Sequence, residues 1–265
     1  MTARPTLAVH TLGACGGCLQ ALLDPLDTLL AMADLVDLTH FPDIGRWDPD
    51  AAVSIAIVEG SVTTDAHAQR VKGLRARAGR LIAVGVCAVA GGPQALRGLA
   101  VDGEEWGAEI SPEIPAAGLL AFPRPVSACV PVDIELWVCP IDSAQLRRIL
   151  QDLLAGIDPA VDARPVCAQC KARGLECLLV TRGVPCMGPV TRAGCGALCP
   201  AYGRACYACF GPAEGLNAES LAALFASQGM TPGQIARTFD FVCNGPAAFP
   251  KALALVPGQG GPEMP

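Results

Sequence analysis

Cysteines are the residues of this chain whose type and spacing could do chemistry, and fourteen of them occur among 265 residues. Eight fall in one stretch, from Cys167 to Cys209, which contains no histidine. Their spacing is C-x2-C-x6-C-x8-C, followed after eight residues by C-x3-C-x6-C-x2-C, which divides into two groups of four. Each group could form a site of four thiolates, and four thiolates bind either zinc or an iron–sulfur cluster. The spacing alone leaves both open.

Four further cysteines lie at three distant places in the sequence, each after a predicted strand: Cys15 and Cys18, Cys87, and Cys139. Because the carboxyl ends of parallel strands gather at one edge of an open α/β sheet, we expect these thiols to converge. Nearby glycines let the backbone approach a bulky group: Gly13, Gly16, Gly17, Gly91 and Gly92. A structural zinc site usually takes two CxxC pairs. One CxxC pair with two isolated, distant cysteines is more typical of a cubane cluster.

The elements that must position these cysteines alternate between strand and helix patterns in the first half of the chain. Predicted strands are the short apolar runs at 6–12, 33–40, 53–58, 80–86 and 133–138. Helical patterns cover residues 19–32, 63–78 and 143–155, with Thr63 or Thr64 as N-cap of the second. The run 53–58 is apolar on both faces, which is typical of a buried parallel strand. This order predicts an α/β fold with a flavodoxin-like doubly wound parallel sheet.

Residues 156–165 have the composition of a linker, and the pattern changes beyond them. Residues 166–215 show little periodicity and many Cys, Gly and Pro, so we expect metal to order them in place of a hydrophobic core. Helical patterns follow at 217–230 and 231–239. The two predicted domains are residues 1–158, flavodoxin-like with the first cysteine group, and residues 159–265, irregular and helical with the other two groups.

The composition is apolar, with 52% hydrophobic residues and a mean hydropathy of +0.41. No apolar run approaches the roughly 18 residues that span a bilayer. We interpret the excess as buried strands plus an apolar surface for a permanent partner. The N-terminal residues show no signal-peptide pattern, so we expect a cytoplasmic protein whose thiols stay reduced. Disulfides are then not expected, and the cysteines indicate metal binding.

Charge is uneven along the chain, whose formal net charge is −6. Between residues 164 and 212, six basic side chains stand against Glu176 alone, which gives a local charge of +5. A basic patch often indicates nucleic-acid binding. Thiolate–metal centres are themselves anionic, however, so we expect local charge compensation and no nucleic-acid partner.

Seven short motifs carry a resemblance that covers nearly the whole chain. They are "GACGGC", "EGS", "VGVCAVAGG" and "CPI" in the first domain, and "VCAQCKARGLECLL", "VPCMGPVTRAGCGALCP" and "CYACFGP" in the second. With these motifs the chain resembles the small, electron-transferring subunit of [NiFe] hydrogenases. The most similar group is the cytoplasmic bidirectional, NADP-linked sulfhydrogenase type, followed by the viologen-reducing methanogen type. The resemblance implies that the C-terminal domain is an iron–sulfur domain.

The resemblance also implies three [4Fe–4S] clusters as cofactors, each held by four thiolates. The proximal cluster, nearest the nickel–iron site, would be bound by Cys15, Cys18, Cys87 and Cys139. The medial cluster would be bound by Cys195, Cys199, Cys206 and Cys209. The distal cluster would be bound by Cys167, Cys170, Cys177 and Cys186. Val138 stands where the family commonly has glycine, which weakens the match at Cys139, and Cys129 is the only plausible substitute. Otherwise Cys129 and Cys243 are interpreted as ordinary thiols.

Two positions distinguish groups within the family that the chain resembles. Membrane-bound relatives have histidine where Cys167 stands. They have proline where Cys199 stands, together with a three-iron medial cluster. These two cysteines therefore predict a relay made only of thiolate-ligated, four-iron clusters. Such clusters have low potentials, which suit exchange with a nicotinamide.

The resemblance implies a subunit of an oxidoreductase that acts on H2. Electrons would pass between the nickel–iron site of the large subunit and diaphorase-type flavin and iron–sulfur subunits, with reversible H2 oxidation. No catalytic residue is expected in this chain. His10, His40 and His67 lack ligand spacing, and Glu59 is interpreted as structural.

Three alternatives remain at this stage. One is a viologen-reducing hydrogenase subunit that feeds ferredoxin or heterodisulfide reductase. A less favoured one is a quinone-reductase-like iron–sulfur subunit, which would hold its cluster with an adjacent Cys-Cys pair. The last is a zinc-binding interaction module without redox activity.

Overall fold

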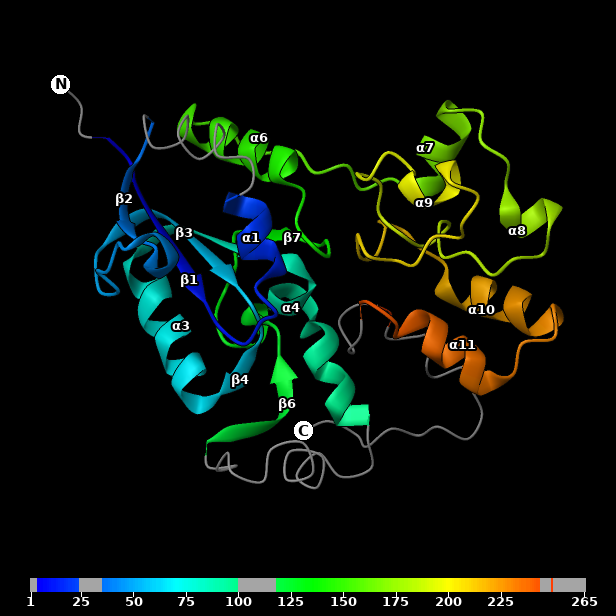
Figure 1. Ribbon diagram of the computed structural model, residues 1–265, viewed down its shortest axis with the longest axis horizontal. Helices are drawn as coiled ribbons and strands as arrows, with labels where there is room; N and C mark the ends of the chain where they lie inside the picture. Colours follow the sequence, from blue (N-terminus) through cyan, green and yellow to red (C-terminus); the bar gives the residue numbers. More distant parts are fainter. Residues whose placement is uncertain (1–3, 24–34, 100–117, 244–248, 250–265) are drawn as a thin grey trace. The chain divides into compact units, whose positions relative to one another are not determined.

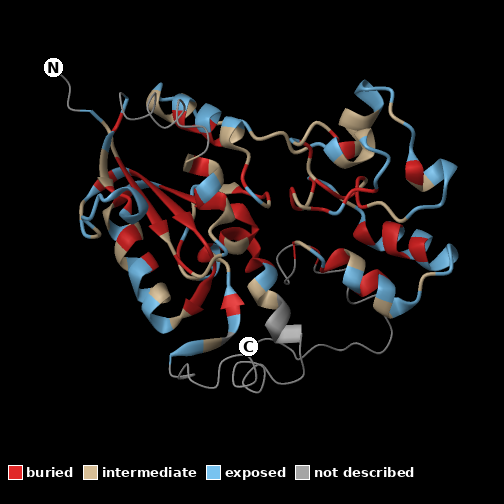
Figure 2. Ribbon diagram, in the orientation of Figure 1, coloured by how far each residue is buried: buried red, intermediate tan, exposed pale blue. Residues whose placement is uncertain are grey.

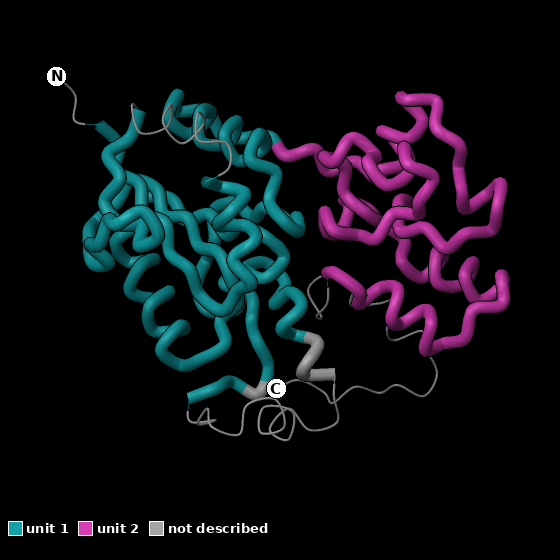
Figure 3. The backbone as a smooth tube through the Cα atoms, in the orientation of Figure 1, with its two compact units in different colours: residues 1–160 teal, residues 161–265 magenta. Residues whose placement is uncertain are grey.

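The computed structural model describes residues 4–23, 35–99, 118–243 and 249 (Figure 1). The chain divides into two compact units, residues 1–160 and residues 161–265 (Figure 3). The sequence placed the domain boundary two residues earlier, after residue 158.

The first unit contains a five-stranded sheet in which every neighbouring pair of strands is parallel. Its strands are β1 (Thr6–Thr11), β2 (Asp37–His40), β3 (Val53–Glu59), β5 (Ala78–Val84) and β7 (Ile134–Leu136). The spatial order is β2-β1-β3-β5-β7. Counted as parallel strands along the chain, this is 2-1-3-4-5, the order of a flavodoxin-like sheet. The predicted fold class is therefore confirmed.

The centre of the sheet is buried, as the apolar runs predicted. Six of the seven residues of β3 are buried, and Ser54 is the exception. Figure 2 shows buried residues concentrated along the central strands. The strand β3 pairs with β1 on one side and β5 on the other, so it is the middle strand of the sheet. Burial of successive residues along it means that both of its faces are covered.

Three of the predicted strands differ from the structure by more than one residue at an end. The strand predicted at 80–86 ends at Val84, because Gly85 has a φ of +81° and turns the chain into α4 (Gly85–Ala90). Cys87 therefore lies inside a short helix and does not directly follow a strand. The strand predicted at 33–40 begins only at Asp37, and the strand predicted at 133–138 shortens to Ile134–Leu136. The antiparallel pair β4 (Val62–Thr64) and β6 (Leu119–Arg124) was not predicted.

Three helices of the first unit lie close to the predicted helical ranges: α1 (Gly17–Leu23), α3 (Asp65–Arg77) and α6 (Ser143–Leu154). The helix α4 and the 3₁₀ helices at Pro42–Ile44, Gly92–Leu99 and Val126–Ala128 were not predicted. The Thr64 hydroxyl accepts a bond from the His67 N–H and caps α3, as one of the two predicted N-caps. The Asp142 side chain accepts a bond from the Gln145 N–H and caps α6. Residues 24–32 of the helix predicted at 19–32 lie outside the described residues.

The second unit is built from short helices and loops: α7 (Val166–Ala172), α8 (Leu178–Thr181), α9 (Leu198–Ala201), α10 (Ala218–Ser227) and α11 (Pro232–Phe239). Thr231 and Gln234 form a capping box at the start of α11, with Pro232 at its first position. Phe239 packs against Phe225 and Phe249, with ring centroids 6.2 and 5.5 Å apart.

The segment 166–215 has some apolar packing of its own, which the sequence did not indicate. It carries buried apolar side chains of its own, among them Met187, Val190 and Phe210. The expectation of a segment without any hydrophobic core was wrong in this respect. Among the described residues of the whole chain, no helix is long and apolar enough to cross a membrane.

A pair of stacked histidines lies inside the first unit. His10 on β1 and His40 at the end of β2 are 2% and 4% exposed, and their ring centroids are 4.3 Å apart. Trp47 meets the His40 ring edge-on at 5.4 Å. Burial, then the neighbouring His40, Arg70 and Arg77, lower the pKa of His10 to about 4. His10 is therefore a neutral core residue at pH 7.

This pair predicts a loss of stability in mild acid. Because the pKa of His10 is lower in the folded protein, the unfolded chain binds a proton first as the pH falls below 6.5. The free energy of unfolding should then fall by about 2 kcal/mol more between pH 7 and pH 5 in the wild type than in His10→Phe. Urea unfolding at the two pH values measures this difference.

A second titrating residue, Glu59, affects both proteins equally, and a variant of another histidine serves as the control. Burial raises the pKa of Glu59 to about 7, which acts with the opposite sign in the same pH range but is common to both proteins. His67→Gln, at a half-buried histidine, should change the pH dependence less than His10→Phe. Equal pH dependence of wild type and His10→Phe would show that His10 is not held neutral.

Candidate metal centres

The first four predicted cysteines meet at the carboxyl edge of the parallel sheet. Cys15 lies in the loop after β1, Cys18 in α1, Cys87 in α4 and Cys139 shortly after β7. Burial, followed by the charges of Cys18, Cys139 and Cys15, raises the pKa of Cys87 to about 12. The pKa of Cys139 is raised by burial and then by Cys15. All four thiols thus lie within electrostatic reach of one another, as expected from the strand order.

Glycines leave the space that these sulfur atoms occupy. A Cβ added at Gly85 would lie 2.6 Å from the Cys18 Sγ, and one at Gly92 would lie 2.6 Å from the Cys87 Sγ. Both glycines have positive φ values, +81° and +61°. The sequence analysis named Gly92 as a glycine that leaves room for a bulky group. It did not name Gly85, because that residue lies within the strand predicted at 80–86.

Glu59 is the last residue of β3 and lies beside the same four thiols. It is 3% exposed, and its Oε2 has no hydrogen-bond partner among the described residues. Burial and then Asp43 raise its pKa to about 7, and its charge contributes to the raised pKa values of Cys18 and Cys87. Its side chain is therefore only partly ionised at neutral pH, and the structural role expected for it stays a prediction.

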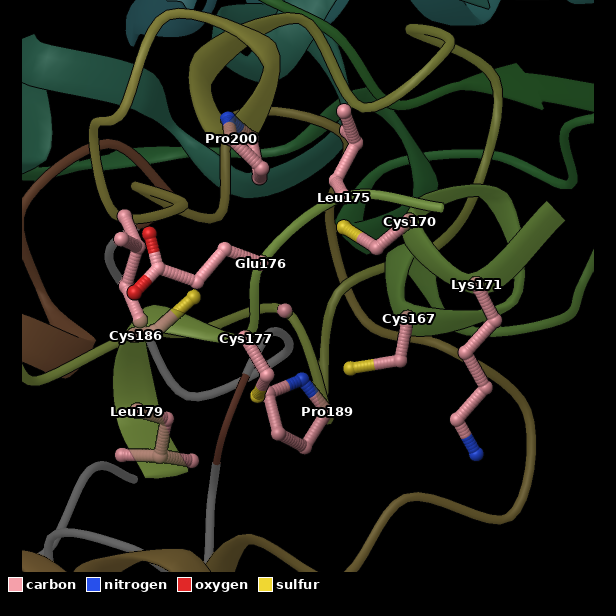
Figure 4. Close-up of a pocket in the computed structure, with 12 residues that line it drawn as sticks. Cys167, Cys170, Lys171, Leu175, Glu176, Cys177, Leu179, Cys186, Pro189 and Pro200 are labelled. Carbon is pink, nitrogen blue, oxygen red and sulfur yellow. The ribbon is translucent and has the colours of Figure 1, made fainter. Parts of the chain in front are cut away.

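A second group of four cysteines surrounds one cavity of about 90 Å³ in the second unit. Figure 4 shows the side chains of Cys167, Cys170, Cys177 and Cys186 arranged around it. Cys167 and Cys170 lie three residues apart on α7, which places them on the same helix face. Burial, then the charges of Cys186, Cys170 and Cys177, raise the pKa of Cys167 to about 11. The structure thus brings this predicted set together.

The structure shows electrostatic contact within two pairs of the remaining predicted set. The pairs are Cys195 with Cys199, and Cys206 with Cys209. Cys195 raises the pKa of Cys199 after burial, and Cys209 contributes to the pKa of Cys206, which burial raises to about 12. The Cys206 N–H also donates to the Cys186 Sγ at 3.3 Å. The two cysteine groups of the second unit are therefore direct neighbours.

Cys243 contacts the loop between Cys206 and Cys209. The sequence did not indicate this role. Cys243 is 1% exposed, and its thiol donates to the Ala208 carbonyl at 2.9 Å. Ala208 has a φ of +63°, which is unusual for a residue with a Cβ, and it lies between Cys206 and Cys209. The other unassigned cysteine, Cys129, lies near Arg124 and Lys72.

The donor chemistry decides which kind of centre these groups fit. None of the fourteen cysteines, all of which lie in the described part of the chain, forms a disulfide, and the three groups contain thiols alone. No three Cys, His, Asp or Glu side chains of the described residues are gathered tightly enough to hold a single metal ion. A four-iron cluster is larger than one ion, so the thiolates around it stand farther apart. Sets of four thiolates are the donors that a four-iron cluster takes, so the residues present fit iron–sulfur clusters.

Comparison with known proteins identifies the family of the chain. The sequence profile of the NADH ubiquinone oxidoreductase, 20 Kd subunit, family matches residues 15–153. Sulfhydrogenase 2 subunit delta of Pyrococcus furiosus is 34% identical over 81% of this chain and 90% of that protein. One subunit of the F420-non-reducing hydrogenase of Methanothermobacter marburgensis is 25% identical over 93% of this chain and 94% of that protein.

A solved structure supports the same relationship. The crystal structure of an NAD+-reducing [NiFe]-hydrogenase in the H2-reduced state contains a chain with a TM-score of 0.55 and 28% identity to this one. The match covers 59% of this chain and 94% of that chain. The sheet with thiols at its carboxyl edge defines an iron–sulfur electron-transfer subunit of an oxidoreductase. More narrowly, the chain belongs to the family of [NiFe] hydrogenase small subunits and is part of such a complex with a large subunit.

The space at Gly85 gives a direct test of the first group. In Gly85→Ala the added Cβ would push the Cys18 Sγ out of place, so about four of about twelve iron atoms per chain should be lost. Gly156→Ala is the matched control, because Gly156 also has a positive φ, +74°, but no atom within 4 Å of an added Cβ. Equal iron contents of the two variants would contradict the assignment.

The choice between Cys139 and Cys129 can be tested in the same way. The structure places Cys139, and not Cys129, with the other three thiols of the first group. Cys139→Ser should therefore lower the iron and sulfide content by about a third, whereas Cys129→Ser should leave both unchanged. The opposite result would assign the fourth ligand to Cys129.

Proposed function

We propose that twelve of the cysteines hold three [4Fe–4S] clusters. The proximal set is Cys15, Cys18, Cys87 and Cys139; the medial set is Cys195, Cys199, Cys206 and Cys209; the distal set is Cys167, Cys170, Cys177 and Cys186. When bound, the clusters carry single electrons between the nickel–iron site of the large subunit and a diaphorase-type flavin and iron–sulfur partner that serves NAD or NADP, in reversible H2 oxidation. The domains follow from this division: residues 1–158 hold the proximal set, and residues 159–265 hold the other two.

The observation that carries the proposal is that all three sets consist of thiols alone. Cys167 lines the distal cavity, where a membrane-bound relative would have an imidazole. Cys199 lies next to Cys195, where such a relative would have a proline without a ligand atom. Each added thiolate brings negative charge, and negative charge around a cluster lowers its potential. Low potentials match those of a nicotinamide acceptor.

Similarity to named proteins supports the nicotinamide-linked form. The relatives include a sulfhydrogenase subunit and a chain of an NAD+-reducing hydrogenase. Similarity to a subunit of an F420-non-reducing hydrogenase favours the second candidate, a subunit that feeds ferredoxin or heterodisulfide reductase. Both candidates use the same twelve cysteines and differ in the partner subunit.

Cations beside the thiols help this chain to hold them in the ionised form. Burial raises the pKa of Cys167, Cys170 and Cys199, because a thiolate loses its hydration there. A cation beside each thiol partly offsets this rise in pKa. Lys171 acts on Cys167, Arg173 on Cys170 and Arg204 on Cys199. We also propose that the protein works in the cytoplasm, where its fourteen thiols, none of which forms a disulfide, stay reduced.

Redox titration of the anaerobically purified complex, followed by electron paramagnetic resonance, tests the cluster types. The proposal predicts only low-potential [4Fe–4S] signals from this chain. Cys199→Pro should convert the medial cluster to a three-iron form, lower the iron content from about twelve to about eleven and raise the medial potential. Proline is tolerated in the first turn of a helix, and residue 199 lies in the first turn of α9.

Cys243→Ser is the control for removal of a cysteine that is not a ligand, since serine keeps a donor for the Ala208 carbonyl. It should leave the medial signal unchanged. A high-potential three-iron signal in the wild type would overturn the all-cubane proposal. H2-dependent reduction of NAD or NADP by the complex with its flavin subunit separates the first candidate from the second.

A further inference from the structure

A cavity of about 460 Å³ lies in the second unit beside α11. Cavities of about 300 to 1,000 Å³ are the usual size of small-molecule sites. Cys206 is the only cysteine of the described residues that lines it, so the cavity is not the space that a set of four thiols encloses. We call it the α11 cavity, and its lining residues include Met187, Tyr207, Met230, Arg237 and Phe241.

The walls of the α11 cavity are mainly apolar and aromatic. Tyr207 and Phe241 are 38% and 60% exposed, and their ring centroids lie 5.9 Å apart with the ring planes tilted by 49°. Met187 and Met230 add thioether groups, which adapt in shape and make favourable contacts with aromatic rings. These walls suit an aromatic ligand, because rings that pack at centroid distances of about 4.5 to 7 Å attract one another.

The amide and hydroxyl groups of the lining side chains already have partners within the chain. The Gln234 side-chain oxygen accepts from the Thr231 N–H at 2.8 Å, as part of the capping box of α11. The Thr238 hydroxyl donates to the Gln234 carbonyl at 2.8 Å. The Tyr207 hydroxyl accepts from the Arg204 guanidinium at 3.4 Å, and this guanidinium lies 6.0 Å from the centre of the Tyr207 ring. These groups are therefore engaged within the protein.

Arg237 is the one charged side chain that lines the cavity in the described part of the chain, and it is exposed. Its guanidinium has no carboxylate within ion-pair distance among the described residues. It lies back along α11, where Gly233 leaves room for it: a Cβ added at Gly233 would be 3.5 Å from the Arg237 Nη1. Asp240, the nearest acid along the chain, is 8% exposed and does not line the cavity. The charge at this cavity therefore favours an anion.

We propose that the α11 cavity binds a planar aromatic anion. The ring system would pack against Tyr207, Phe241 and the two methionines, and the anionic group would lie beside the Arg237 guanidinium. Ring packing and a hydrogen bond between charged groups act together here, so a ligand needs both features to bind well. The inference goes beyond the proposed function, and it does not depend on which metal the thiols hold.

The alternative explanation is that a side chain of a partner subunit fills the cavity in the assembled hydrogenase. The two explanations differ in what they predict for the intact complex. A cavity that a partner subunit covers is closed to a small molecule there, whereas a ligand site stays open. The experiment therefore uses the intact complex as purified, without H2 or dithionite, so that a reducible probe stays oxidised.

The probe is anthraquinone-2-sulfonate, which has three fused rings and one negative charge. Its dissociation constant is measured by calorimetry and compared with those of N-methylacridinium, a cation with three fused rings, and methanesulfonate, an anion without a ring. The variants are Arg237→Ala, Arg237→Lys and Phe241→Ala. One control is Tyr202→Ala, at an aromatic residue of the same unit that is 78% exposed and does not line the cavity. The other is Arg147→Ala, at an exposed arginine of α6. H2-dependent reduction of benzyl viologen checks that each variant is assembled.

We expect the wild-type complex to bind anthraquinone-2-sulfonate at least about tenfold more tightly than either comparison compound. Arg237→Ala should weaken binding about tenfold and Phe241→Ala about fivefold, while Arg237→Lys and both controls keep the wild-type affinity to within about threefold. Absence of binding by the wild-type complex would show that the cavity is covered and overturns the proposal. Equal binding of the anion and the acridinium cation, or unchanged binding in both alanine variants of the cavity, overturns it as well.

Discussion

The structure depends on one electrostatic constraint, which is that buried thiols must be ionised to bind metal although burial opposes their ionisation. Burial raises the pKa of Cys18, Cys87 and Cys206 to about 12 and that of Cys167 to about 11. Each thiolate also raises the pKa of its neighbours. In the proposed function the positive charge of a bound metal centre compensates a whole set, so we expect metal binding to order the thiols. The nearby cations and glycines reduce the cost without removing it.

The parallel sheet brings cysteines that are distant in the sequence to one edge, and this arrangement could be predicted from the sequence. Strands such as β3 are apolar on both faces, which indicated parallel pairing, and parallel pairing puts all carboxyl ends at one edge. Cys15 and Cys139 are more than a hundred residues apart, and the strand order alone predicted that they meet. The structure bears this out although β7 is only three residues long.

The contacts that the sequence could not show depend on conformation and on distant neighbours. Gly85 was counted within a strand, because no sequence pattern reveals a positive φ, and so the placement of Cys87 in a helix was missed. Cys243 has no ligand spacing, and only the fold places it under the Ala208 carbonyl. His10 and His40 gave no signal, since their burial arises from the packing of β1 beside β2.

The central claim is that three sets of four thiols hold three four-iron clusters. The most direct test is the iron, acid-labile sulfide and zinc content of the anaerobically purified wild-type chain, together with its visible spectrum. The account predicts about twelve iron and twelve sulfide per chain, negligible zinc, and a brown colour that dithionite bleaches. About three zinc atoms per chain, no sulfide and no visible colour would contradict it.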